Sequence, residues 1–384
     1  MNGFKIYASD HYNEALDILR RLCVIPAPSH HEEQRALFCR DYLLSLGAEN
    51  VYIDDKLNVI YPVNCDGSNE ITVFAAHTDT VFPDTAPYPM SEDDEKIYCP
   101  GVGDDTASVT VLLLLAKYFI ENRIMPDKGV LFVMNSCEEG LGNLEGTKAL
   151  MKAYSGRIKR FITFDSADPN ELCDKCVGSH RYEVEVRTQG GHSFSCFGRK
   201  NAIRELSQIV TEIYNIQVPQ IESSKTTYNV GIIEGGTSVN TIAQNAKMLC
   251  EYRSDNRECL AYMKERFSEI FEKAANDEVK VNVKLVGERP CMGDVDPILQ
   301  KKLCDTCADT ITNINGKDVQ RKIASTDCNI PLSLGIPSVC IGVFRGGGAH
   351  TREEYVIKSS LSEGLEIALN VSSCLLKSDG LIFT

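Results

Sequence analysis

The segment "ITVFAAHTDTV", residues 71–81, has the pattern of a buried β-strand that ends in polar side chains. Its mostly apolar first half predicts a strand that is covered on both faces. His77 and Asp79 follow two residues apart, and in an extended chain this spacing places both side chains on one face. His77 could then bind a metal ion while Asp79 accepts a hydrogen bond from the other ring nitrogen. Alone, the pair is equally compatible with an ordinary surface histidine and aspartate.

The segment "CPGVGDDTASV", residues 99–109, places Asp104 and Asp105 between a glycine-rich turn and a predicted helix. A glycine-rich turn before a helix can hold a phosphate. Two aspartates at the anion position argue against a phosphate and suit a cation, and one carboxylate can bridge two metal ions. Alone, such a pair is more often a helix N-cap than a set of ligands.

The segment "MNSCEEGLGN", residues 134–143, places Glu138 and Glu139 side by side where another apolar run ends. Adjacent carboxylates repel each other, and in a strand their side chains point to opposite faces. We therefore expect the two glutamates to have different roles. The spacing alone does not decide which of them has which role.

Two further strands end in residues of the same type. "RFITFD", residues 160–165, ends at Asp165, and in "GVFRGGGAH", residues 342–350, His350 follows three glycines in the loop after the strand. Ligands of open α/β sheets bind at the carboxyl ends of the strands. Each motif is weak alone, but together they predict a metal centre. The candidate ligands are His77, Asp104, Glu139, Asp165 and His350.

The order of predicted elements divides the chain into two domains. Strands alternate with helices up to about residue 177 and again from about residue 292, which predicts a parallel or mixed sheet. Residues 178–291 read as β-α-β-β-α-β, the split βαβ arrangement. The predicted fold class is therefore α/β, with a mixed-sheet domain from residues 1–177 and 292–384 and an inserted ferredoxin-like α+β domain.

The composition excludes several classes of partner. A formal net charge of −14 argues against nucleic acid, which selects basic surfaces. The longest apolar run, residues 109–116, is too short to span a membrane. The chain does not open with a basic segment followed by an apolar one, so we expect no signal peptide and a cytoplasmic protein.

Sixteen cysteines in a chain of this length do not indicate a secreted disulfide framework. Two pairs, "CDKC" at residues 173–176 and "CDTC" at residues 304–307, have the spacing of a Cys₄ zinc site. The second pair lies in a predicted helix, where cysteines three residues apart are more often small buried side chains. A Cys₄ site is therefore the minor alternative.

Five short motifs occur in an order that resembles a known family. They are "HTD" at 77–79, "GVGDD" at 101–105, "EEG" at 138–140, "FD" at 164–165 and "GGGAH" at 346–350. In this order the chain resembles the M20 family of dinuclear zinc peptidases. The resemblance extends over almost the whole chain, from "IPAPSHHEE" at residues 25–33 to "STDCNIPLSLGIPSV" at residues 325–339.

The resemblance implies a role for each candidate ligand. Asp104 would bridge two zinc ions, with cobalt and manganese as alternatives. The remaining ligands would be His77 and Asp165 for one ion, and Glu139 and His350 for the other. Glu138 would be the general base, Asp79 would assist His77, and the peptide bond after Asp104 would often be cis. Thr106 departs from the family pattern, which has a lysine at that position.

The resemblance also gives the inserted domain a role as a lid and as the contact of a homodimer. His192, Asn240 and Arg253 look like the family's substrate-binding residues. On their own, a histidine in a loop is more often solvated, and an arginine at a strand end is more often a surface cation.

The function implied by the resemblance is hydrolysis of short peptides by a tripeptidase-like aminopeptidase. The close alternatives are an N-acyl amino acid amidohydrolase and a dipeptidase with the same metals and base. A non-catalytic metal-binding scaffold is the least favoured interpretation, because all five ligand positions and Glu138 are present.

Overall fold

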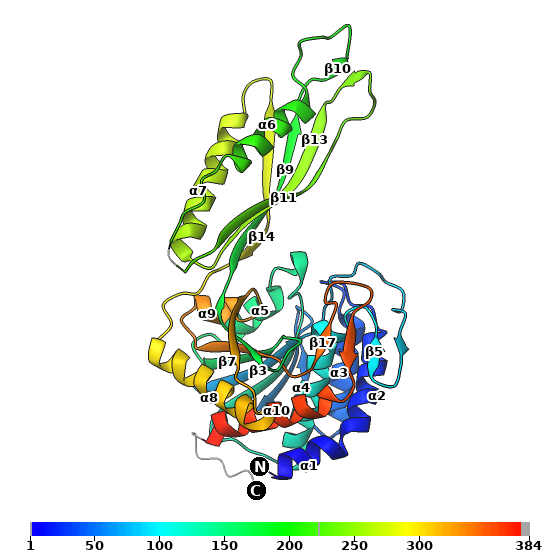
Figure 1. Cartoon of the computed structure of the whole chain (residues 1–384), viewed down its shortest axis with the longest axis vertical. Helices are drawn as coiled ribbons and strands as arrows, with labels where there is room; N and C mark the ends of the chain where they lie inside the picture. Colours follow the sequence, from blue (N-terminus) through cyan, green and yellow to red (C-terminus); the bar gives the residue numbers. More distant parts are fainter. Residues whose placement is uncertain (1, 222, 378–384) are drawn as a thin grey trace. The chain divides into compact units, whose positions relative to one another are not determined.

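The computed structural model describes residues 2–221 and 223–377, which form two compact units (Figure 1). Unit 1 consists of Met1–Cys176 and Gly293–Thr384, and unit 2 consists of Val177–Met292. Residues 1 and 378–384 of the predicted mixed-sheet domain lie outside the described residues. The division into a catalytic domain and a lid stays a prediction, and each unit is described by itself.

Unit 1 is built around an eight-stranded mixed sheet with the order β1-β2-β6-β3-β7-β16-β8-β15. The strands are β1 (Tyr52–Ile53), β2 (Val59–Val63), β3 (Ile71–His77), β6 (Gly129–Asn135), β7 (Ile158–Phe164), β8 (Glu171–Cys176), β15 (Gln320–Ala324) and β16 (Ser338–Ile341). The four central strands β6, β3, β7 and β16 run parallel. Every residue of β3 and β6 is buried, as expected for strands that are covered on both faces. The predicted mixed sheet is confirmed.

Helices pack around this sheet in layers. They are α1 (Asn2–Asp10), α2 (Tyr12–Cys23), α3 (Glu33–Ser45), α4 (Ser108–Glu121), α5 (Glu145–Ala153), α8 (Pro297–Asn315), α9 (Asn329–Ser333) and α10 (Ser360–Lys377). α4 is mostly apolar and is buried from Ser108 to Phe119, because β3, β6 and β7 lie on one side of it and α10 on another. α10 in turn packs on α1 and α8 (Figure 1).

A small second sheet of unit 1 was not predicted. Its order is β17-β18-β5-β4, from β4 (Ser91–Glu92), β5 (Lys96–Tyr98), β17 (Gly346–Gly347) and β18 (Tyr355–Ile357). β18 pairs antiparallel with β5, and Tyr355 lies opposite Tyr98. This pairing brings the chain just after "GGGAH" beside the chain just before "GVGDD".

The minor alternative of a Cys₄ zinc site is wrong for the residues that the structure describes. Cys173 lies in β8 opposite Cys340 of β16, whereas Cys304 and Cys307 are buried in α8. The group of side chains with metal-ligand spacing in the described part of the chain contains no cysteine.

Unit 2 has a four-stranded antiparallel sheet with the order β11-β13-β9-β14. Its elements are β9 (Gly178–Arg187), α6 (Ala202–Tyr214), β11 (Thr226–Gly235), β13 (Asn245–Ser254), α7 (Arg257–Ala274) and β14 (Lys280–Arg289). They follow the predicted β-α-β-β-α-β succession, and α6 and α7 both pack on the sheet. A separate ribbon of two short strands, β10 (Gly191–His192) and β12 (Thr241–Ile242), extends from this sheet (Figure 1).

Among the described residues, no helix combines the length and the apolar character needed to cross a lipid bilayer.

Candidate metal centre

His77 is the last residue of β3, and its buried imidazole is oriented by Asp79. The ring atom Nδ1 lies 3.1 Å from the backbone oxygen of Asp79, which can only accept a hydrogen bond. Nδ1 therefore carries the proton, and in the neutral ring Nε2 presents its lone pair. Nε2 lies 3.0 Å from Oδ1 of Asp104 and 4.0 Å from Oδ1 of Asp165. A lone pair that faces carboxylate oxygens is an arrangement suited to a cation.

Asp79 connects three parts of unit 1 through one buried carboxylate. Its Oδ1 accepts from the backbone N–H of Glu138 at 2.9 Å, and its Oδ2 accepts from that of Glu139 at 2.9 Å. The Ser29 hydroxyl also donates to Oδ2, at 2.6 Å. Burial raises the pKa of Asp79, but the contacts with His77, Ser29 and Glu139 outweigh it and hold this pKa below its usual value. Asp79 is therefore charged, and it positions both His77 and the loop of the two glutamates.

Asp104 lies at the centre of the cluster and faces a histidine on each side. Its Oδ1 is 3.0 Å from Nε2 of His77, and its Oδ2 is 3.1 Å from Nε2 of His350. The backbone at Asp104 is not helical, with φ −93° and ψ 96°, and the peptide bond from Asp104 to Asp105 is cis. Because its two oxygens face different histidines, the Asp104 carboxylate has the orientation of a ligand shared by two ions.

The far side of the cluster is formed by His350 and Glu139. Nε2 of His350 lies 3.0 Å from Oε1 of Glu139. Ligand atoms of His77, Asp104 and Glu139 all lie within 4.8 Å of one another. Five side chains that are separate in sequence thus meet at the carboxyl ends of β3, β6 and β7.

The electrostatics of the cluster indicate an excess of negative charge. Burial lowers the pKa of His77, but contacts with Asp104 and Asp79 outweigh burial and raise this pKa well above its usual value. Asp104 and Glu139 likewise raise the pKa of His350 to about 10. The carboxylates that raise the pKa of both imidazoles also favour a bound divalent cation, because its positive charge would offset their negative charge.

The expectation that Glu138 and Glu139 point to opposite faces of a strand was wrong. β6 ends at Asn135, so both glutamates lie in the following loop, where Cys137 has a positive φ of 59°. Glu139 contacts His350. Burial is the largest cause of the raised pKa of Asp165, and the negative charge of Glu138 adds to it. The Glu139 carboxylate therefore belongs to the cluster, and the charge of Glu138 acts on it.

Glu354 is a residue of the centre that sequence reasoning missed. Its buried carboxylate accepts three backbone N–H groups, from Gly101 at 2.8 Å, Gly103 at 2.9 Å and Asp104 at 2.7 Å. Burial and the charge of Asp104 raise the pKa of Glu354 to about 7, although these hydrogen bonds lower it. The only local signal in the sequence was the neighbouring glutamate, Glu353. The burial of Glu354 depends on the pairing of β18 with β5, which is distant in sequence.

The environment of Thr106, where the family resemblance implies a lysine, contains an arginine from another helix. The Thr106 hydroxyl accepts from Nη1 of Arg35 at 2.9 Å and donates to the backbone oxygen of Gly101 at 2.5 Å. Arg35, in α3, is fully buried and also donates to the backbone oxygens of Thr78 and Ile25. A cation therefore lies beside this turn, but it comes from residue 35.

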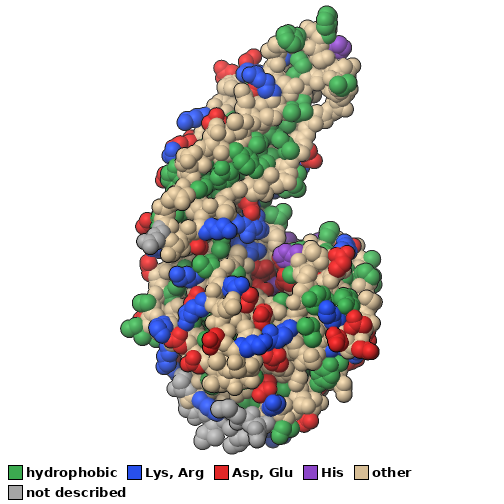
Figure 2. Space-filling view, viewed as in Figure 1, with side chains coloured by type: hydrophobic (Ala, Val, Ile, Leu, Met, Phe, Trp, Pro, Cys, Tyr) green, Lys and Arg blue, Asp and Glu red, His purple; other side chains and the backbone are tan. Residues whose placement is uncertain are grey.

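In unit 2 the structure brings His192 and Asn240 together. β10 pairs with β12, and the backbone N–H of Ser193 donates to the oxygen of Asn240 at 2.9 Å. Nδ1 of His192 accepts from the backbone N–H groups of Phe194 at 3.2 Å and Ser195 at 3.4 Å. The proton of the neutral ring is therefore on Nε2. Apolar side chains are exposed at this end of unit 2 (Figure 2).

Arg253 lies at the other end of the same sheet. It pairs with Ser179 at the start of β9, whereas His192 follows the end of β9. Its guanidinium makes two contacts with the Glu251 carboxylate, at 2.7 and 3.1 Å. The structure therefore does not group Arg253 with His192 and Asn240 within unit 2.

The comparisons with known proteins agree with this geometry. Residues 73–372 match the profile of peptidase family M20/M25/M40. The chain is 26% identical over 272 residues to a probable carboxypeptidase of Arthroderma benhamiae, covering 63% of this chain and 58% of that protein. It is 22% identical over 353 residues to succinyl-diaminopimelate desuccinylase of Corynebacterium glutamicum, covering 90% and 92% of the two chains. The chain thus spans little more than half the length of the fungal relatives.

Solved structures have the same fold. Aminopeptidase PepT from Bacillus cereus matches with a TM-score of 0.70 at 21% identity, covering 94% of this chain and 97% of that one. A tripeptidase from Staphylococcus aureus matches with a TM-score of 0.73 at 22% identity, covering 94% and 98%. The fold is thus shared with solved structures of an aminopeptidase and a tripeptidase. The chain belongs to peptidase family M20/M25/M40, which confirms the predicted family.

We predict that Glu354→Gln destabilises unit 1. The glutamine amide group would place an N–H₂ against one of three backbone donors, which leaves a buried donor without an acceptor and costs about 1–3 kcal/mol. Urea unfolding measures this loss. The control is Glu353→Gln, the exposed neighbouring residue, which should unfold at the wild-type midpoint. Equal midpoints for both variants would contradict the positioning role of Glu354.

Proposed function

We propose that the protein is a metal-dependent hydrolase of peptide or amide bonds in which Asp104 bridges two metal ions. The observation that carries the proposal is the orientation of the Asp104 carboxylate, whose two oxygens lie 3.0 and 3.1 Å from the two histidines. Membership of peptidase family M20/M25/M40 supports the reaction class.

The donor set fits two zinc ions. Imidazole nitrogens and carboxylate oxygens are common zinc ligands, and they also suit cobalt and manganese. One ion would be held by His77, Asp165 and Asp104, and the other by His350, Glu139 and Asp104. The position of the His77 Nε2 atom, which faces the carboxylates of Asp104 and Asp165, supports this fit.

In the proposed reaction the chain's own residues position water and move protons. The bound metal pair would lower the pKa of water toward about 7 and polarise the scissile carbonyl. Glu138 would take a proton from the attacking water and deliver it to the leaving nitrogen. Asp79 would fix His77 and, through the backbone N–H groups that it accepts, the loop that carries Glu138.

We propose short peptides as substrates, cleaved as by a tripeptidase-type aminopeptidase. The fold likeness to PepT and to the staphylococcal tripeptidase supports this choice. His192 would donate from Nε2 to the developing oxyanion, with Asn240 beside it. Arg253 would bind a substrate carboxylate, for which it would have to release Glu251. A cytoplasmic location and a homodimer formed through unit 2 belong to the same proposal.

The second candidate is hydrolysis of N-acyl amino acids or dipeptides at the same centre. It is favoured by the curated relatives that are named succinyl-diaminopimelate desuccinylase, which match up to 90% of the chain, and by a likeness to human carnosine dipeptidase 1 at a TM-score of 0.69. A non-catalytic scaffold is less favoured, because the ligand cluster and Glu138 are all in place.

A pair of variants tests the roles of the two glutamates. Glu138→Gln should retain wild-type metal content and lose hydrolysis by at least about 100-fold, because general base catalysis contributes about 10² to 10⁴ in rate. Glu139→Gln, the matched control one residue away, should lower the metal content per chain after dialysis. Metal content is measured by elemental analysis and rate by release of free amine. Near-normal turnover of Glu138→Gln would overturn the base assignment.

A substrate screen tests the peptidase proposal. The zinc-loaded protein is incubated with free dipeptides and tripeptides, and in parallel with N-acetylated amino acids. We expect the tripeptides to be cleaved fastest, because the proposed activity is that of a tripeptidase-type aminopeptidase. Cleavage of the acetylated set alone would favour the second candidate. If neither set is cleaved while two metal ions are bound, the non-catalytic interpretation replaces both.

A further inference from the structure

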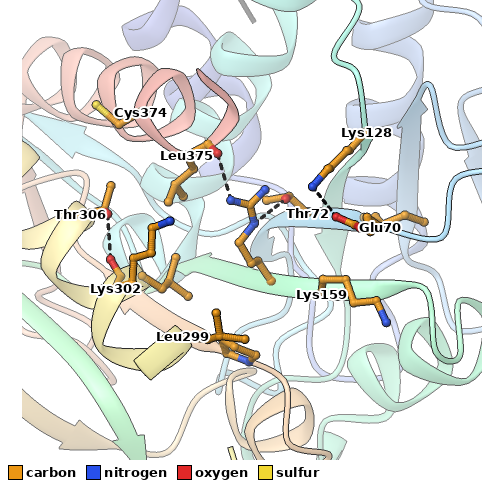
Figure 3. A pocket seen from close by; sticks show the side chains of 13 residues that line it. Glu70, Thr72, Lys128, Lys159, Leu299, Lys302, Thr306, Cys374 and Leu375 are labelled. Atoms are coloured by element: carbon orange, nitrogen blue, oxygen red, sulfur yellow. Dashed lines mark hydrogen bonds and ion pairs between the residues drawn. The ribbon is translucent and has the colours of Figure 1, made fainter. Parts of the chain in front are cut away.

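Unit 1 has a cavity of about 280 Å³ at the amino ends of its central strands (Figure 3). The first residues of β3 and the start of β7 line it, and α8 and α10 form its other walls. β3 runs from this cavity at Ile71 to the candidate metal centre at His77. Six residues of extended chain separate the two sites by about 20 Å. The cavity is therefore distinct from the hydrolytic site.

Mostly positive charged side chains line this cavity, although the protein as a whole is acidic. Among the residues that the structure describes, four cationic side chains line it, those of Lys128, Lys159, Arg160 and Lys302, against one acidic side chain, Glu70. Four positive charges less one negative charge leave a net +3 over the described lining residues. The whole chain has a formal net charge of −14, so this concentration does not follow from composition.

Two of the cations are held by contacts at the cavity wall. Nε of Arg160 donates to the Thr72 hydroxyl at 3.1 Å, and Nη1 donates to the backbone oxygen of Leu375 at 3.0 Å. These two contacts fix the guanidinium between β3 and α10. Lys128 forms an ion pair with Glu70.

Lys302 extends from α8 into the cavity (Figure 3). Within the described residues, no hydrogen bond or ion pair of its ammonium group is recorded. Its helix neighbour Lys301 differs, since it is paired with Asp305 and does not line the cavity. Lys302 is thus available to a bound anion at the wall that Arg160 helps to form.

The remaining wall is apolar, formed by Leu299, Leu303, Pro337 and Leu375. A ligand that fills the cavity would therefore have an anionic group at one end and a less polar body at the other. A dianionic phosphate matches the net charge of +3 better than a single carboxylate does. Arginine and lysine are also the usual phosphate-binding side chains.

We propose that this cavity binds a small organic phosphate, with Lys302 contacting the phosphate group and the leucines contacting the organic part. The volume is close to the lower end of the range for small-molecule sites, which is about 300–1,000 Å³. A sugar phosphate or a nucleoside monophosphate has the corresponding chemistry.

Cys374 provides a readout that does not depend on hydrolysis. It is an exposed thiol that lines the cavity, so a bound ligand should shield it from iodoacetamide. The metal-loaded protein is alkylated with and without adenosine monophosphate, glucose 6-phosphate or inorganic phosphate, and peptide mass spectrometry reports each cysteine. At a concentration about twice its dissociation constant, a bound phosphate compound should slow Cys374 alkylation about threefold. Cys196 of unit 2 should react at an unchanged rate.

Charge reversal assigns the protection to this cavity. Lys302→Glu should abolish the protection of Cys374, whereas Lys301→Glu, with the same charge change one residue away, should preserve it. Adenosine, which lacks the phosphate, should not protect. The proposal is overturned if none of the organic phosphates slows Cys374 alkylation, or if Lys302→Glu is protected as well as Lys301→Glu. Neither result bears on hydrolysis, because a phosphate bound at the metal centre would not shield Cys374.

Discussion

The buried carboxylate of Asp79 is the contact on which the candidate metal centre depends. It accepts two backbone N–H groups from the loop of Glu138 and Glu139, accepts the Ser29 hydroxyl, and lies beside the ring of His77. A buried charge is costly unless hydrogen bonds satisfy it, and hydrogen bonds to charged groups contribute about 1.5–3 kcal/mol each. One fully buried side chain thus sets the relative positions of a histidine at the end of β3 and of both glutamates after β6.

Glu354 positions backbone in the same way, at the turn that carries Asp104. Its three backbone contacts hold the turn that carries Asp104, and the pairing of β18 with β5 delivers it there. The centre therefore has two kinds of carboxylate. Those of Asp79 and Glu354 accept backbone N–H groups, and the others face the two imidazoles. Positioning of this kind gives ligands a defined geometry before a cation or a substrate binds.

Much of this arrangement could be predicted from the sequence. The strand that ends at His77, the strands that precede Glu139 and Asp165, and the glycine-rich loops that carry Asp104 and His350 follow from local patterns. Their ligands were expected together because the carboxyl ends of parallel strands meet at one edge of a sheet. Glu354 and Arg35 could not be predicted in the same way. Each acts through contacts with residues far away in the sequence, Glu354 across about 250 positions. The alternation argument for Glu138 and Glu139 failed because a strand ending cannot be placed to within two or three residues by pattern.

Anomalous diffraction from crystals of the zinc-loaded protein, measured on both sides of the zinc absorption edge, tests the central claim most directly. The account predicts two zinc peaks on either side of the Asp104 carboxylate, one next to His77 and Asp165 and the other next to Glu139 and His350. A single peak, or a pair of peaks that does not share Asp104, would contradict it.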